Sequence, residues 1–131
     1  MSYIVRYQKF INAIRTVEIA LPVNQSGQEL ATLDGYTYVS IPDGVTLPTQ
    51  PSEITVQAVT MTPTLSAQIA AASPQVRVIN DRVVSMIGEQ YSMHEEIKLL
   101  RTAPSEEFDI YNEYVESCRA WGRAQKTALG L

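Results

Sequence analysis

The sequence is poor in the residues on which cross-links and metal sites depend. Cys118 is its single cysteine, so the chain can form no disulfide within itself, which fits a reducing compartment or assembly inside a cell. His94 is the single histidine, and the run His94-Glu95-Glu96 lacks the second histidine that a zinc-binding helix needs. We therefore expect no metal site, an exposed His94 in a first helical turn, and a Cys118 that is buried as a small apolar side chain.

The sequence also lacks an excess of positive charge and a long apolar run. Ten lysine and arginine residues stand against 14 aspartate and glutamate residues, for a net charge of -4. A negative chain has no electrostatic footprint for nucleic acid or for an anionic membrane. The longest weakly polar stretch, residues 65–72, falls far short of the roughly 20 residues that span a bilayer, and the first ten residues do not follow the signal-peptide pattern. We expect neither nucleic acid nor membrane as a partner.

Catalytic signatures are missing as well. The glycines are scattered and form no phosphate-binding loop, and the single histidine and cysteine fall on different predicted helices. The acidic pairs Glu95-Glu96 and Glu106-Glu107 come at predicted helix starts, where the helix dipole explains them. We expect no catalytic residue, no cofactor and no small-molecule substrate, and an enzyme is the last of our hypotheses.

Residues 1–60 have the alternation and the turn residues of a β-rich region. Asp34-Gly35 suits a tight hairpin, because glycine adopts positive φ at little cost. Further turns are predicted over residues 24–27 and 42–44, and an extended linker over 47–52, where two prolines disfavour helix. Strands are predicted over residues 3–7, 16–21, 29–33, 36–41 and 54–58.

The pattern changes to helical spacing near residue 62. Thr62-Pro63 and Ser73-Pro74 each place a capping residue before a proline at the first helical position. Ser92 and Glu95 have the spacing of a capping box. A long last helix is predicted over about 105–129, with Gly130 as its stop. The fold class is therefore α+β, with short antiparallel strands in a β-rich N-terminal region, 1–60, and a helical C-terminal region, 61–131; whether two domains meet between them is left open.

Two rows of residues along the last helix are the candidate partner-binding surface. Both follow steps of three and four residues, and together they form an apolar face wider than one neighbouring helix needs. Either one row packs inside the chain and the other meets a partner, or both rows face one larger core. The first row, the seam, consists of Tyr111, Val115, Cys118, Gly122, Gln125 and Leu129, and the second row consists of Ile110, Tyr114, Ser117, Trp121, Ala124 and Ala128.

Small residues in the middle of the seam admit a close neighbour. Gly122 costs about 1 kcal/mol relative to alanine inside a helix, so a packing reason is expected. The alternative is an ordinary helix contact within the chain that ends in solvent near Gln125. In the second row, Tyr114 and Trp121 combine an apolar ring with a polar tip, which suits the edge of an interface.

The C-terminal third carries a resemblance. The capped segment Tyr91-Ser92-Met93-His94-Glu95-Glu96-Ile97-Lys98-Leu99-Leu100-Arg101 is followed by Tyr111-Asn112-Glu113-Tyr114-Val115-Glu116-Ser117-Cys118-Arg119-Ala120-Trp121-Gly122-Arg123. This pattern resembles the C-terminal part of small proteins from the tail region of tailed bacteriophages. It covers residues 91–131, and the resemblance implies no catalytic residue.

The resemblance implies a virion protein near the tail fibres or baseplate, made in the bacterial host cytoplasm. Its expected partners are other tail proteins, further copies of itself, or both. The first hypothesis is a non-enzymatic structural or adaptor subunit of the tail. The alternative is a tail-fibre assembly chaperone that is absent from the mature particle.

Overall fold

The chain divides into two compact units. The computed structural model describes residues 2–21 and 27–131, so residues 24–26 of one predicted turn lie outside the described residues. Unit 1 takes in Met1–Val76 and Thr127–Leu131, and unit 2 takes in Arg77–Lys126. Unit 1 therefore combines the β-rich region with the first helix and the last five residues, and unit 2 lies between two segments of unit 1 in the sequence.

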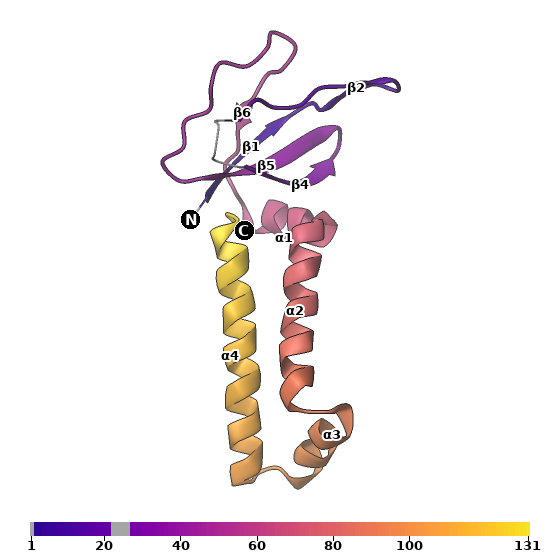
Figure 1. Cartoon of the computed structure of the whole chain (residues 1–131), viewed down its shortest axis with the longest axis vertical. Coiled ribbons are helices and arrows are strands. Elements are labelled where there is room, and N and C mark those ends of the chain that lie inside the picture. The colour runs from indigo at the N-terminus through magenta and orange to yellow at the C-terminus, as the bar shows by residue number, and fades with distance from the viewer. Residues whose placement is uncertain (1, 22–26) are drawn as a thin grey trace. The chain divides into compact units, whose positions relative to one another are not determined.

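Within the described ranges, unit 1 contains a sheet of four antiparallel strands in the order β4-β5-β1-β6 (Figure 1). The central strands are β1 (Ser2–Tyr7) and β5 (Tyr36–Pro42), in which Tyr3 pairs with Ile41. The outer strands are β4 (Gln28–Leu33) and the short β6 (Gln57–Ala58). The predicted strands over 3–7, 29–33 and 36–41 are confirmed.

The turn between β4 and β5 is the predicted two-residue hairpin. Leu33 pairs with Tyr36, and Asp34 and Gly35 both have positive φ, 51° and 83°. Two positive φ values in succession give the turn whose twist matches that of the flanking strands. The turn over 42–44 also forms, closed by a hydrogen bond from the Val45 amide to the Pro42 carbonyl (3.2 Å).

Alternation along the central strands divides the core of unit 1 between the two faces of the sheet. On one face, Ile4 and Tyr38 pack with Ile69 of helix α1 (Pro63–Ala72), and Leu129 and Leu131 add to this cluster. On the other face lie Val5, Tyr7, Val39, Ile41 and Ile54, covered by side chains from the segments 17–21 and 45–56.

The predicted strand over 16–21 is wrong. Its first residue lies in the two-residue strand β3 (Arg15–Thr16), which pairs with β2 (Phe10–Asn12), and residues 17–21 form no strand. The alternation nevertheless predicted the burial correctly, because Val17, Ile19 and Leu21 all pack on the same core cluster. The side-chain amide of Gln50 donates to the Ala20 carbonyl (2.9 Å) and accepts from the Ala20 amide (2.8 Å), in place of a neighbouring strand.

The strand predicted over 54–58 is shorter than expected. The Ile54 amide donates to the Pro51 carbonyl (2.9 Å) in a turn, and pairing begins at Gln57.

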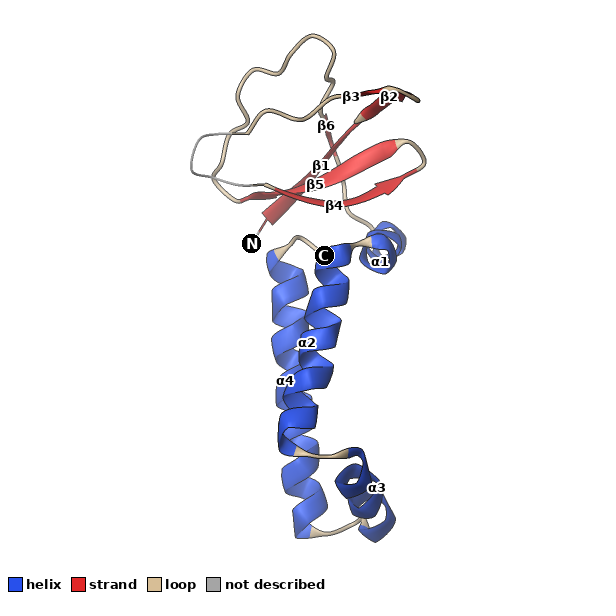
Figure 2. Ribbon diagram, turned by 45° about the vertical axis from the view of Figure 1, so that its right-hand side comes forward, coloured by secondary structure: helices blue, strands red, loops and turns tan. Residues whose placement is uncertain are grey.

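The predicted helix starts are confirmed. The Thr62 hydroxyl accepts from the Leu65 amide (3.1 Å) ahead of α1, and Pro74 opens α2 (Pro74–Gln90). Ser92 and Glu95 form the reciprocal capping box of α3 (Met93–Thr102). The long helix α4 (Glu106–Ala128) is followed by Gly130, whose φ of 92° does not continue a helix. Antiparallel strands followed by helices (Figure 2) make the fold α+β, as expected.

Candidate partner-binding surface of unit 2

The seam of α4 packs inside unit 2. Val115, Cys118 and Gly122 are buried, and α2 and α4 run side by side (Figure 1). A Cβ atom at residue 122 would lie 2.8 Å from Cγ2 of Val83, so the absence of a side chain is what lets α2 approach. While these helices are paired, the three seam residues cannot contact a separate partner.

The seam reaches solvent near Gln125, as the hypothesis of an ordinary helix contact within the chain predicts. Gln125 is exposed, and Leu129 belongs to unit 1, where it packs against the cluster containing Ile4. At the other end, Tyr111 is half-buried and its hydroxyl donates to Oε1 of Glu96 in α3 (2.8 Å). Burial, followed by this bond to a carboxylate, raises the pKa of Tyr111.

The second row of α4 is largely at the surface. The side chain of Ile110 is 57% exposed and that of Trp121 is 37% exposed. Tyr114 is half-buried, and its hydroxyl donates to the carbonyl of Met86 in α2 (2.7 Å). Of the residues predicted to bind a partner, Ile110 and Trp121 are therefore those that a second protein can reach most fully.

An aromatic cluster joins the end of α2 to α4. The ring centroids of Tyr91 and Tyr111 lie 4.9 Å apart with an edge-on geometry, and Tyr91 lies 5.9 Å from Tyr114. Edge-on pairs are favourable because the positive edge of one ring meets the negative face of the other. The cluster fixes the turn between α2 and α3 against α4.

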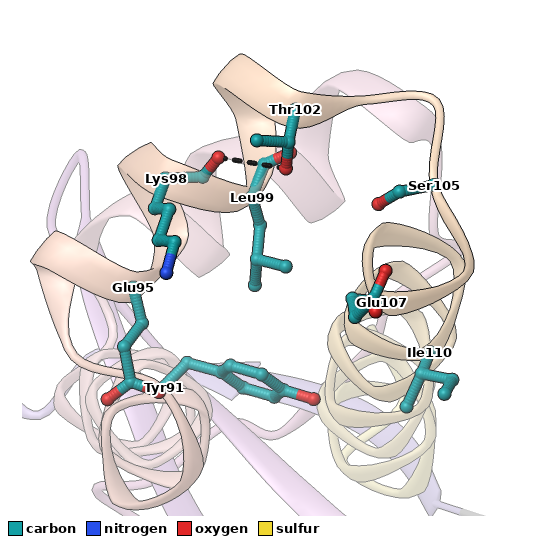
Figure 3. Close-up of a pocket in the computed structure, with 8 residues that line it drawn as sticks. All are labelled: Tyr91, Glu95, Lys98, Leu99, Thr102, Ser105, Glu107 and Ile110. Carbon is teal, nitrogen blue, oxygen red and sulfur yellow. Dashed lines mark hydrogen bonds between the residues drawn. The ribbon is translucent and has the colours of Figure 1, made fainter.

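A hollow of about 580 Å³, which we call the α3–α4 hollow, lies beside this cluster. In Figure 3, Leu99 points into it from α3 and the Tyr91 ring lies below. Its position follows from the local structure, because α3 ends at Thr102 and α4 begins after Ser105, whose hydroxyl accepts from the Phe108 amide (3.0 Å). The residues that line the hollow are Tyr91, Glu95, Lys98, Leu99, Thr102, Ser105, Glu107 and Ile110.

The sequence did not predict the α3–α4 hollow. Its residues come from four segments, and no spacing in the sequence shows that they meet. The exposed Ile110 was the one member already assigned to a partner surface. The hollow combines apolar side chains with carboxylates and an ammonium group, a lining suited to an apolar group with a polar tip.

The residues set aside as catalytic candidates lie where they were expected. His94 is exposed in the first turn of α3, and Cys118 is buried as a free thiol. Within residues 2–21 and 27–131, no three histidine, cysteine or acidic side chains are grouped so that they could hold a metal ion. Over the same residues, no helix is both long enough and apolar enough to cross a membrane.

Comparison with models of known protein families gives no match, and comparisons with curated proteins and with solved structures give none either.

Proposed function

We propose that this chain is a non-enzymatic structural or adaptor component of a bacteriophage tail, associated with the fibre or baseplate, which acts by packing against other proteins. The tail setting is supported by the resemblance of residues 91–131, a stretch that comprises α3, α4 and the last residues of the chain. The mode of action is supported by the surface of unit 2.

The observation that carries the proposal is the exposure of large apolar side chains on unit 2. Single exposed apolar residues are normal on any protein, whereas a group of them on one small unit is typical of an interaction surface. Within the described residues, those exposed on unit 2 are Val78, Val84, Met93, Ile97, Leu100, Ile110 and Trp121.

Helix α3 illustrates the same point. It has ten residues and none of them is buried, although its sequence is amphipathic. Met93, Ile97 and Leu100 lie four and three residues apart on one face and are 74%, 44% and 60% exposed. Helices shorter than about 12 residues gain most of their stability from the packing of an apolar face. A protein that covers this face would stabilise α3.

Mass spectrometry of purified phage particles tests the proposal. A structural or adaptor subunit is expected in washed particles in a fixed ratio to the other tail proteins. An assembly chaperone is expected in complexes from infected cells and not in the particles. Absence from both the particles and every tail-protein complex would contradict the proposal.

A variant makes the test specific to a surface. Trp121→Ala in the full chain removes the largest exposed side chain of the second row and should reduce incorporation into particles. The matched control is Ile14→Ala in unit 1, which also removes an exposed apolar side chain. Normal incorporation of Trp121→Ala would exclude the second row as the surface that binds the tail.

A further inference from the structure

The second row of α4 has two prominent side chains on a single face. Ile110 and Trp121 are eleven residues apart, which corresponds to about three helical turns and about 17 Å along the axis. Their side chains therefore project in nearly the same direction from two places on the helix. Between them lie Tyr114 and Ser117, and the exposed alanines Ala124 and Ala128 continue the row.

The same face carries the α3–α4 hollow at one end. Ile110 and Glu107 line the hollow, and both belong to the first half of α4. Trp121 stands in the second half. One face of unit 2 thus presents a concave apolar site and, about three turns away, a large ring that is 37% exposed.

Charge is divided between the two ends of unit 2. Residues 77–84 and 117–126, which face each other where Gly122 approaches Val83, carry five lysine or arginine residues and one acidic residue. Residues 85–116 carry two basic and eight acidic residues. The end with Trp121 is therefore positive, and the end with the hollow is negative. Two such units attract each other when they lie antiparallel, and they repel each other when they lie parallel.

We propose that two copies of this chain pair through the second row, antiparallel, about a two-fold axis that crosses α4 between Tyr114 and Ser117. The ring of Trp121 of each copy then enters the α3–α4 hollow of the other. This inference deepens the proposed function, because it names a second copy as one of the proteins that unit 2 binds.

The hollow has the chemistry that an indole ring requires. Tyr91, Leu99 and Ile110 offer apolar contact, and the carboxylates of Glu95 and Glu107 are acceptors suited to the indole N–H. A volume of about 580 Å³ lies in the range of pockets that hold a ring system. Because the axis relates the two contacts, each dimer makes both of them and the assembly closes at two copies.

Sedimentation of the full chain at micromolar concentration is the first test. We expect a dimer that weakens as salt is raised, because the charged ends are at the surface. Trp121→Ala should weaken pairing at least about 30-fold, as the loss of a central aromatic anchor does. Ile110→Asp, at a site that is 57% exposed, should do the same while leaving the helix content measured by circular dichroism unchanged. It replaces Trp121→Ala if that variant proves unstable.

Cross-linking tests the axis. Ser117→Cys places a thiol beside the proposed axis and should give a covalent dimer with a short bismaleimide. Asn112→Cys is the matched control, because residue 112 is also exposed but projects from the opposite side of α4. The parent chain, whose Cys118 is buried, gives the background.

Three results would overturn the proposal: a monomeric parent chain at 100 times the concentration of the first experiment, a dimer that both Trp121→Ala and Ile110→Asp leave intact, or equal cross-linking at residues 112 and 117. These results concern pairing alone. Particle incorporation is measured separately, so the failure of the tail role and the failure of pairing can be distinguished.

Discussion

The two units of this protein differ in the size of the apolar side chains that they bury. Unit 1 buries large residues such as Tyr7, Leu30, Ile41 and Ile69 on the two faces of its sheet. In unit 2, the residues buried among 77–126 are Val115, Cys118 and Gly122, all of them small or medium in size. Its larger apolar side chains are half-buried, as Ile87 and Phe108 are, or exposed, as Ile110 and Trp121 are. Burial of apolar area is the main source of stability. Unit 1 therefore has a core of large apolar residues of its own. Unit 2 has a core of smaller residues and would gain stability if a partner covered its exposed apolar side chains.

The largest effect that tests this comparison is expected in unit 1. Ile41→Ala should lower the free energy of unfolding by about 2–5 kcal/mol, because Ile41 is fully buried and its loss leaves a cavity. Ile14→Ala, at a side chain that is 97% exposed, is the control and should change it by less than about 0.5 kcal/mol. Urea unfolding of both variants provides the measurement. Equal values for the two would mean that the sheet is not the main core.

Gly122 tests the contact between α2 and α4. Gly122→Ala should destabilise the protein by about 1–3 kcal/mol, because the new Cβ would lie 2.8 Å from a methyl group of Val83, and a valine in a helix has little freedom to turn away. Gly88→Ala in α2 is the matched control. A Cβ there meets nothing within 4 Å, so alanine should stabilise the helix by up to about 1 kcal/mol. If both variants were stabilised in a thermal melt, residue 122 would not be in a tight contact.

The capping box of α3 should have a smaller effect. Ser92→Ala removes a hydroxyl that accepts from the Glu95 amide (3.2 Å), and the expected loss is about 0.5–2 kcal/mol. Ser85→Ala, at an exposed position inside α2, lacks a capping role and is the control. Thermal melts followed by circular dichroism would measure both. A parent-like melt for Ser92→Ala would show that α3 contributes nothing to the cooperative transition.

Alkaline pH should lower the stability of both units, whereas a change of pH near neutrality should not. Burial raises the pKa of Tyr7 in unit 1 and the pKa values of Tyr111 and Tyr114 in unit 2 above 10.0. A hydrogen bond to Glu29 raises the pKa of Lys9 above 10.5. Groups whose pKa is raised on folding stabilise the protein fully below their unfolded pKa, and this contribution is lost as pH rises through the folded value.

The free energy of unfolding should therefore fall as pH rises above about 10. Tyr7→Phe should reduce that fall, because phenylalanine has no group that ionises at alkaline pH. Urea unfolding of the parent and the variant at pH 7, 9 and 11 would measure the free energy of unfolding of each. A parent and a variant that lose equal stability between pH 9 and 11 would exclude a contribution from Tyr7.

Local chemistry explains what the sequence could predict about the fold. Thr62, Ser92 and the pair Asp34-Gly35 act on residues within three positions of themselves, and the helix starts and the hairpin formed as expected. In the segment 16–21, where the predicted strand is wrong, Ala20 has its backbone hydrogen bonds with the side chain of Gln50, thirty residues away, and not with a neighbouring strand. Alternation in the sequence predicts which side chains are buried. It does not by itself predict that the segment pairs with another strand.

The candidate site was predictable to a similar extent. Spacing along α4 separated a seam from a second row, and the structure places the centre of the seam against α2. Spacing could not show which row would be covered, because that depends on where α2 lies. It also could not predict the α3–α4 hollow, whose lining comes from Tyr91, α3, the following turn and the start of α4.

The return of the chain to unit 1 after α4 has a mechanical consequence. The hydroxyl of Ser2 donates to the carbonyl of Ala128, and that of Ser40 donates to the carbonyl of Leu129, both at 2.7 Å. A force that pulls residues 2 and 131 apart therefore acts first on the hydrogen bonds between these two segments of unit 1. Unit 2 is inserted in the sequence between Val76 and Thr127, so the force reaches it only after these bonds break. Stretching the chain between residues 2 and 131 thus strains unit 1 before it strains the helices of unit 2.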